Sequence, residues 1–373
     1  MRWAKHFFPI ILLCSVLLGG LTGYLVGPEV GRLKPFGDIF LKLILTTVFP
    51  LIFFSVSSAI ARIGSFKKVG KIIFYTAGVF IFTGVVASIY TLIIVKIFPP
   101  AQGVYLKLTA PESKISTVSF PNIILVLIII SILVGMVGKS FLKFLQAGEV
   151  IFMRVFSIIM YYAPIGFFCY FAVLVSELGT QLMHSYMRVT IIYYVFGIIY
   201  FLVGFTFYAY LAGRLEGVKL FWKNVFLPMI TSIATCSSAA SIPANLVATK
   251  AMGVSPEIYE TVVPLGAIIH KDGSVIGGVI KIAFLFGIFH LSFSGVSVLL
   301  TALGVSLLVG TVMGAIPSGG MLGEVLILSV YGFPTSALIA IAAISIIIDP
   351  LATMLNVTGN SVSSMMIRRL VDP

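Results

Sequence analysis

Charged side chains are scarce in this sequence. Asp, Glu, Lys and Arg make up 10% of its 373 residues, whereas hydrophobic residues make up 60%. Soluble globular domains carry about 25% charged residues. A chain this apolar cannot bury its surface in one aqueous core, so lipid must be the solvent for much of it. The composition therefore predicts an integral membrane protein.

Cysteine and histidine are also few. The three cysteines, Cys14, Cys169 and Cys236, show no CxxC spacing, and the four histidines are scattered. We therefore expect no disulfide framework, no metal centre and no organic cofactor. The alternating segments of about 10 residues that build membrane β-barrels are missing as well. Any spans should accordingly be helical.

Acidic residues are half as numerous as basic ones, with 12 against 24, which gives a formal net charge of +12. Such a charge would suit a nucleic-acid partner, but we expect none, because the basic residues gather in short loops as the positive-inside rule predicts. We assume that all six apolar runs given in the next paragraph cross the membrane. One side then holds Arg2, Lys5, Arg62, Lys67, Lys68, Lys71, Lys139, Lys143, Arg214, Lys219 and Lys223. This side is the cytoplasm, where we place both termini.

Long apolar runs are the main feature that the sequence does contain. Runs of about 20 apolar residues predict transmembrane helices, and they occur at 7–27, 38–61, 72–98, 119–138, 150–175 and 189–212. The first run is too long for a signal peptide and has no convincing cleavage site. We expect a multi-pass protein of the bacterial cytoplasmic (inner) membrane.

The pattern changes after residue 213. A short apolar stretch, 220–234, leads into a serine-rich tip and back, and the long segment 256–289 that follows is interrupted at 270–274. The same order recurs, because 296–314 leads into a Pro/Gly tip and back, and 335–366 is interrupted at 356–360. Paired broken segments of this kind are typical of the binding site of a secondary transporter.

Two carboxylates, Asp272 and Asp349, lie deep in apolar segments. A carboxylate at the membrane centre costs about 2.5–3.5 kcal/mol even on the mild insertion scale, so it needs a partner or a task. Lys271 with Asp349 could be a purely structural pair. A spacing of 4, 3 and 4 residues, however, puts Asp349, Thr353, Asn356 and Asn360 on one helical face. This face favours a ligand, proton or ion site.

The two tips offer a second kind of contact. A helix that stops inside the membrane leaves free N–H groups or carbonyls, and a helix N-terminus suits a carboxylate. The tips at Ser237–Ser238 and Pro317–Gly320 could therefore hold a carboxylate, and Asp349 could hold an ammonium group. Together these contacts describe an amino acid.

Six motifs, in order along the chain, resemble those of the dicarboxylate/amino acid:cation symporter family, which includes the glutamate and neutral amino acid transporters. They are FPLIFFSVSSAIA at 49–61, MYYAPIGFF at 160–168, TCSSAASIP at 235–243, HKDGS at 270–274, AIPSGG at 315–320 and DPLATMLNVTGN at 349–360. The resemblance implies an all-α polytopic membrane protein of eight transmembrane helices and two re-entrant helical hairpins, with inverted repeats.

The resemblance also implies a homotrimer in lipid, in which a transport domain moves against a scaffold like an elevator. The scaffold would be 1–70 and 99–188, which hold helices 1, 2, 4 and 5. The transport domain would be 71–98 and 189–373. It would contain helices 3 and 6, hairpin 1 at 215–253, helix 7 at 256–289, hairpin 2 at 296–332 and helix 8 at 335–370.

The departures from the family pattern concern the substrate first. Asp349 matches the aspartate that binds the substrate ammonium, but Ala352 and Cys236 stand where family members have a carboxylate-binding arginine. A buried carboxylate without a guanidinium is poorly compensated, so a neutral amino acid is expected. The implied substrate-binding residues are Ser237, Ser238, Ser274, Pro317, Ser318, Gly319, Asp349, Ala352, Thr353 and Asn356.

The sodium sites of the family are altered too. Asn360 replaces a final aspartate, and Lys271 replaces a methionine, where its ammonium could act as a built-in cation. On helix 3, the family's oxygen ligands become Thr76, Val79 and Phe80. The expected coupling residues are His270, Lys271, Asp272, Asn356 and Asn360. We therefore expect weak or no sodium dependence, with Na⁺ or H⁺ as the possible coupling ion.

The leading hypothesis is thus secondary transport of a small neutral amino acid. A sodium- or proton-coupled symporter of acidic amino acids or dicarboxylates is the first alternative, and it would need an arginine from elsewhere in the chain, since Arg154, near the start of helix 5, is expected to be too distant. A non-transporting receptor of the same fold is another. An enzyme is not expected, because His270, Lys271 and Asp272 show no arrangement of nucleophile, base and orienting group.

Overall fold

The computed structural model describes residues 2–63, 70–101, 130, 134, 141–178, 180–312 and 320–371. Throughout these ranges the regular structure is helical, with no strand. The span expected at 119–138 lies almost wholly outside the described residues. The tip residues Pro317, Ser318 and Gly319 also lie outside them.

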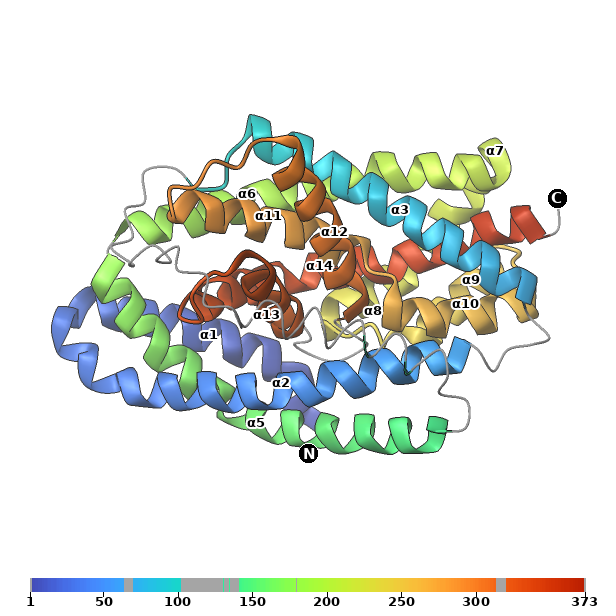
Figure 1. The fold of residues 1–373 in the computed structure, drawn as a ribbon. Coiled ribbons are helices and arrows are strands. Elements are labelled where there is room, and N and C mark those ends of the chain that lie inside the picture. The colour runs from blue at the N-terminus through green and yellow to red at the C-terminus, as the bar shows by residue number, and fades with distance from the viewer. Residues whose placement is uncertain are drawn as a thin grey trace.

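The N-terminal half forms a group of long helices. α1 (Arg2–Val26) leads through a 3₁₀ turn, η1 (Gly27–Leu33), into α2 (Lys34–Ile63), and both helices pack against α5 (Leu142–Leu178). Figure 1 shows the three helices together along the lower side of the molecule. Gly19 and Gly23 of α1 lie against the backbone of α5, where a Cβ atom would overlap it. Small residues permit such close helix packing in membranes.

The next helices follow the spans predicted at 72–98 and 189–212, and the second begins earlier than expected. α3 covers Gly70–Ile97, and α6 (Thr180–Ile199) continues through a π-helical turn, η4 (Tyr200–Gly204), into α7 (Phe205–Asn224). The backbone leaves the helical conformation at Gly213 and Arg214, where Arg214 has a positive φ of 52°. This kink coincides with the change of pattern that the sequence shows after residue 213.

Each broken unit begins with two short helices that pack on one another. α8 (Phe226–Thr235) and α9 (Ile242–Ala251) are joined by the serine-rich turn, and α12 (Val296–Val312) packs on α13 (Gly320–Tyr331). Between these pairs, α10 (Pro256–Ile269) and α11 (Asp272–Ile288) are separated by two extended residues, His270 and Lys271. The predicted break at 270–274 is therefore present, although it is shorter than expected.

The second polar interruption does not end its helix. α14 runs from Ala337 to Val371, through residues 356–360, as expected for a helix at 335–370 with a polar face. Asn356 and Asn360 bond to side chains of other segments, as described below. A helix tolerates polar side chains when buried partners satisfy them.

α14 lies at the centre of the second group of helices. It packs against α3, α7, α8, α10, α11 and α13, and Figure 1 shows it running through the middle of the molecule. Large apolar side chains remain on the outside, including Phe74, Tyr161 and Val296, which are 74–75% exposed. Such surfaces require lipid or a partner to cover them.

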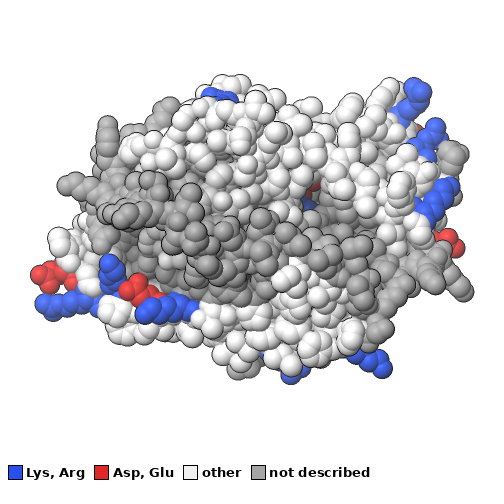
Figure 2. Space-filling model, in the orientation of Figure 1, with Lys and Arg blue, Asp and Glu red and all other residues white. Residues whose placement is uncertain are grey.

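The surface and the helix lengths agree with a protein that spans a membrane. Among the described residues in Figure 2, most Lys and Arg side chains lie towards the two ends of the face. Four stretches of the described chain are long and apolar enough to cross a bilayer, namely Ile11–Phe40, Gly70–Ile97, His184–Asn224 and Ala337–Val371. These features support the predicted integral membrane protein.

Candidate functional site

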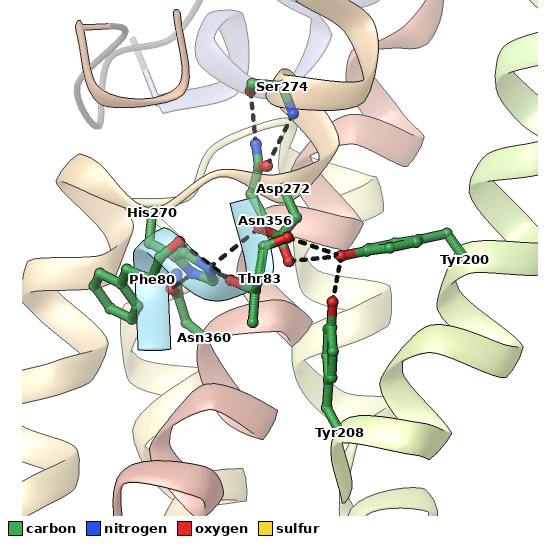
Figure 3. A network of polar contacts seen from close by, with 9 residues as sticks. All are labelled: Phe80, Thr83, Tyr200, Tyr208, His270, Asp272, Ser274, Asn356 and Asn360. Carbon is green, nitrogen blue, oxygen red and sulfur yellow. Dashed lines mark hydrogen bonds and ion pairs between the residues drawn. The ribbon is translucent and has the colours of Figure 1, made fainter. Parts of the chain in front are cut away.

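The break between α10 and α11 carries the largest polar network in the core. His270 and Lys271 have φ values of −120° and −148°, and both side chains are buried. The break leaves the first N–H groups of α11 without partners inside the helix. Asn356 of α14 supplies one, because its Oδ1 accepts from the Ser274 N–H at 3.2 Å. Its Nδ2 donates to the Ser274 hydroxyl at 3.1 Å, as Figure 3 shows.

His270 is held on every side. Its Nδ1 lies 2.8 Å from Oδ1 of Asn360, and its Nε2 lies 2.7 Å from the Thr83 hydroxyl and 3.2 Å from Oδ1 of Asp272. The ring of Phe80 stacks on the imidazole with 4.1 Å between centroids (Figure 3). Three oxygen atoms thus surround one imidazole in a site that excludes solvent.

The second oxygen of Asp272 faces two tyrosines. The Tyr200 hydroxyl donates to Oδ2 at 3.2 Å, and it lies 3.0 Å from the Tyr208 hydroxyl. Thr83, Tyr200 and Tyr208 were not expected at this site. Each is an isolated hydroxyl in a long apolar helix, and Thr83 is 187 residues from His270, so the sequence alone gives no signal for their convergence.

Of the altered residues of α3, Phe80 contacts this network through its stacking on His270. Thr76 donates its hydroxyl to the carbonyl of Ile72 in its own helix at 2.7 Å, and Val79 and Phe80 are buried apolar side chains. The oxygens that remain, from Thr83, Asp272 and Asn360, already contact the imidazole. A metal cation at this point would have to displace the His270 ring.

A second polar region surrounds Asp349. This carboxylate is half-buried and accepts a hydrogen bond from the Thr353 hydroxyl at 3.1 Å. Lys271, which is 6% exposed, interacts electrostatically with Asp349. Among the described residues, the Lys271 ammonium makes no hydrogen bond and no ion pair within 4.0 Å. A buried ammonium without a close partner is expensive in a membrane protein, so this one has capacity for a ligand.

Ala352 lies beside this region, at the contact of α11 with α14. Gly273 approaches the backbone of Ala352 so closely that a Cβ atom would overlap it. The side chain of Ala352 offers no charge, as the sequence indicates. Any cation for a substrate carboxylate must therefore come from another helix.

The turn between α8 and α9 joins two helices that pack against α14, the helix of Asp349. The Tyr194 hydroxyl also reaches α14, where it donates to the carbonyl of Ile347 at 3.0 Å. Cys236 ends α8 in the left-handed conformation, with φ 46° and ψ 36°, which is uncommon for a residue other than glycine and often marks a functional site. The Ser237 hydroxyl accepts from the Ala240 N–H at 3.2 Å, and Ser238 is buried.

The structure thus brings together three of the predicted groups. His270, Asp272 and Asn360 form one cluster, Asn356 with Ser274 forms a clamp beside it, and Asp349 with Thr353 faces Lys271 and the serine-rich turn. Within the described ranges, no group of three or more His, Cys, Asp and Glu is arranged to hold a metal ion.

Comparison with known proteins adds an independent finding. A family model described as the sodium:dicarboxylate symporter family matches residues 8–370. The chain is 26% identical to a "Proton/sodium-glutamate symport protein" of Bacillus caldotenax, over 95% of this chain and 93% of the relative. A protein of the same name from Geobacillus stearothermophilus is 27% identical over the same shares. A "C4-dicarboxylate transport protein" of Anaeromyxobacter sp. (strain K) is 24% identical, over 99% of this chain and 90% of the relative.

Proposed function

This chain belongs to the sodium:dicarboxylate symporter family, and on that premise we propose that it is a secondary transporter that carries an acidic amino acid together with a proton. The family is one of membrane transporters, which supports a transport function. The observation that carries the finer assignment is the buried Lys271 ammonium, which faces Asp349 and has no closer partner among the described residues.

An acidic amino acid suits the charges of this region. Its ammonium group would bind the Asp349 carboxylate beside Thr353, and its side-chain carboxylate would bind the Lys271 ammonium. Its α-carboxylate would face the turn at Ser237 and Ser238. Opposite charges that meet in a site of low dielectric give strong, charge-assisted hydrogen bonds. Lys271 would then replace the arginine whose family position is occupied by Ala352.

The relatives support a carboxylate substrate, since their names give glutamate and C4-dicarboxylates. A dicarboxylate without an ammonium group would leave Asp349 facing a like charge, which favours the amino acid. The neutral amino acid expected from Ala352 and Cys236 has no support from these names. It stays the second candidate, because Lys271 and Asp349 could instead neutralise one another and leave no cation for a side-chain carboxylate.

Weak sodium dependence is part of the proposal. The imidazole of His270 contacts the oxygens of Thr83, Asp272 and Asn360, and α3 adds apolar side chains at Val79 and Phe80. These contacts leave few free oxygens for a hard cation. Since the relatives are named as proton or sodium symporters, we assign the coupling to a proton.

The larger architecture of the proposal follows the family resemblance. It comprises eight spans, two re-entrant hairpins formed by α8–α9 and α12–α13, and a homotrimer in the cytoplasmic membrane. The transport domain, 71–98 and 189–373, would move as an elevator against the scaffold, 1–70 and 99–188. The separate packing of α1, α2 and α5 on one side and of the helices around α14 on the other supports this division.

Uptake into proteoliposomes tests the proposed function. Each experiment offers one labelled substrate in an external medium that contains either sodium or choline. The external pH is either equal to the internal pH or lower. The substrates are glutamate, aspartate, alanine, serine, threonine and succinate. We expect glutamate or aspartate to accumulate with choline when the exterior is acidic. Accumulation of alanine, serine or threonine alone would establish the second candidate. Loss of all uptake in choline would refute proton coupling.

A further inference from the structure

A second buried cluster of charges lies outside the network around His270. The Lys281 ammonium of α11 lies 3.0 Å from Oε1 of Glu324 on α13, and the two side chains are 3% and 0% exposed. Lys281 also donates to the Ser345 hydroxyl of α14 at 2.7 Å, and this hydroxyl contacts the same oxygen of Glu324. One ion pair therefore joins three helices.

The carboxylate of Glu324 is only half satisfied. Both contacts go to Oε1, whereas Oε2 is buried and has no hydrogen-bond partner. A buried polar atom without a partner requires an explanation, and an ionisable side chain in a membrane-spanning core is by default a candidate functional group. The free oxygen is a position at which a proton can add without breaking an existing contact.

The cluster is also close enough to the substrate region to respond to it. Ser345 lies one helical turn before Asp349 on α14, and the charges of both Lys281 and Glu324 act on Asp349. Any change in the charge at Asp349 must therefore change the electrostatic potential at Glu324.

We propose that Glu324 is the group that binds the coupling proton, and that the Lys281–Glu324–Ser345 cluster is the proton site of this transporter. The inference rests on the proposed function, because it requires an acidic substrate. It adds a site that the family motifs do not contain, since Lys281 and Glu324 lie outside all six of them.

An acidic substrate changes the charge balance of this buried region. Without substrate, the charges of Lys271 and Asp349 cancel in sum, as do those of the Lys281–Glu324 ion pair. An acidic amino acid brings one ammonium and two carboxylates, so binding adds one negative charge to a buried region. A proton restores neutrality. Asp349 is engaged by the substrate ammonium and by Thr353, whereas Glu324 has a free oxygen.

The step itself is a simple protonation. A proton from the outer solution adds to Oε2, and the carboxylate becomes a carboxylic acid, while no other bond forms or breaks. Lys281 stays charged, so its charge now balances the second carboxylate of the substrate. After release of the substrate inside, the proton returns to solution and the ion pair forms again.

Other ionisable groups around Glu324 do not replace it in this role. α11 contributes Lys281 and, at its start, Asp272, whose buried Oδ1 lies 3.2 Å from Nε2 of His270. α14 contributes Asp349 and, in its last turn, Arg368 and Arg369, and α12 carries no ionisable side chain. α2 also packs on α13, but its Lys34 and Lys42 are exposed and Asp38 is half-buried. Within the described ranges, none of these three forms an ion pair with Glu324.

The variant Glu324→Gln tests the proposal, because glutamine has the shape of the protonated acid and cannot release a proton. In proteoliposomes loaded with unlabelled glutamate, exchange for labelled glutamate needs no net proton movement and should continue at a rate near that of the wild type. Accumulation driven by a pH gradient should be lost, whereas one coupled proton gives the wild type about tenfold accumulation per pH unit. Ser329→Ala, a buried change on the same helix, should retain both activities.

Each other result has a definite meaning. Accumulation driven by a pH gradient in Glu324→Gln would overturn the proposal. If a His270 variant lost this accumulation instead, the proton site would be assigned to His270. Loss of both exchange and accumulation in a correctly folded variant would assign Glu324 a structural role only, and would overturn the proposal too. A wild type that carries no acidic amino acid in either assay would refute the proposed function, and this inference with it.

If Glu324→Gln does not fold, infrared difference spectroscopy of the wild type decides. Addition of glutamate to the purified protein should produce the band of a newly protonated carboxylic acid, and this band should shift in Glu324→Asp. Absence of the band, or an unshifted band in Glu324→Asp, would overturn the assignment.

Discussion

Lys271 and Lys281 are both buried, but their surroundings differ. Lys271 directly precedes the first residue of α11, and Lys281 lies inside that helix. Lys281 lies in a regular part of α11 and meets Glu324 at 3.0 Å and Ser345 at 2.7 Å. Lys271 lies in the break before α11, and its interaction with Asp349 is only electrostatic. A regular helix thus places one ammonium group against a partner, and an interrupted helix presents the other to a ligand.

The sharpest way to break this comparison is to make the same substitution at both lysines. Lys281→Met leaves the Glu324 carboxylate buried without its cation, which should reduce the free energy of unfolding by about 3–5 kcal/mol. Lys271→Met removes an ammonium that has no close partner, so the free energy of unfolding should stay the same or increase. Thermal unfolding of both variants in detergent measures the difference.

A double variant is the control for this effect. Lys281→Met with Glu324→Leu removes both charges and should recover most of the lost stability, because apolar residues can replace a buried ion pair. Equal stability of the two single variants would contradict the view that the lysines have different roles.

The second prediction concerns the substrate. Lys271→Met should weaken glutamate or aspartate binding by about 10- to 100-fold, since a hydrogen bond to a charged group contributes about 1.5–3 kcal/mol. Binding of glutamine or alanine should change little, because neither has a side-chain carboxylate. Equilibrium binding to the purified variant gives both affinities, and an equal loss for all four ligands would mean that Lys271 only supports the fold.

The third prediction addresses the other residue of the break. His270→Asn should remove the contacts of the imidazole with Thr83 and Asp272 and reduce the free energy of unfolding by about 1–3 kcal/mol. It also opens space among three oxygens, so sodium should stimulate uptake by the variant more than by the wild type. Uptake in sodium and in choline measures this change, and identical sodium responses would remove His270 from the coupling site.

The smallest expected effect concerns Thr353, which donates to Asp349. Thr353→Val removes one hydrogen bond to the carboxylate but leaves the carboxylate in place for the substrate ammonium. It should therefore weaken binding of every amino acid substrate by about 0.5–1.5 kcal/mol, less than the loss of a direct hydrogen bond to a charged group. Thr358→Val is a matched control on the same helix, since the Thr358 hydroxyl bonds only to Met354. Comparable losses in both variants would indicate a general effect on α14.

The sequence allowed several of these features to be predicted for physical reasons. The helical period placed Asp349, Thr353, Asn356 and Asn360 on one face, and the structure shows all four in hydrogen bonds, either within α14 or to the α10–α11 break. The short, polar-ended apolar runs predicted the helix pairs α8–α9 and α12–α13. Local composition carries this kind of information.

Other features depend on contacts between distant segments. Lys281 and Glu324 could have been noticed as ionisable residues in apolar runs, by the rule applied to Asp272, but their pairing joins residues 43 positions apart. The partners of Asn356 and Asn360 are likewise distant, because Ser274 lies on α11 and His270 lies in the break before it. The sequence shows a polar face on α14 but not which residues form hydrogen bonds with it.

The central claim is that Lys271 and Asp349 together select an acidic amino acid. The most direct measurement is the affinity of the wild-type protein for two matched pairs, glutamate with glutamine and aspartate with asparagine, because each pair differs by one charge at nearly constant shape. We predict that the acid of at least one pair binds about tenfold or more tightly than its amide, as a charge-assisted hydrogen bond would provide. Equal or tighter binding of both amides would contradict the account.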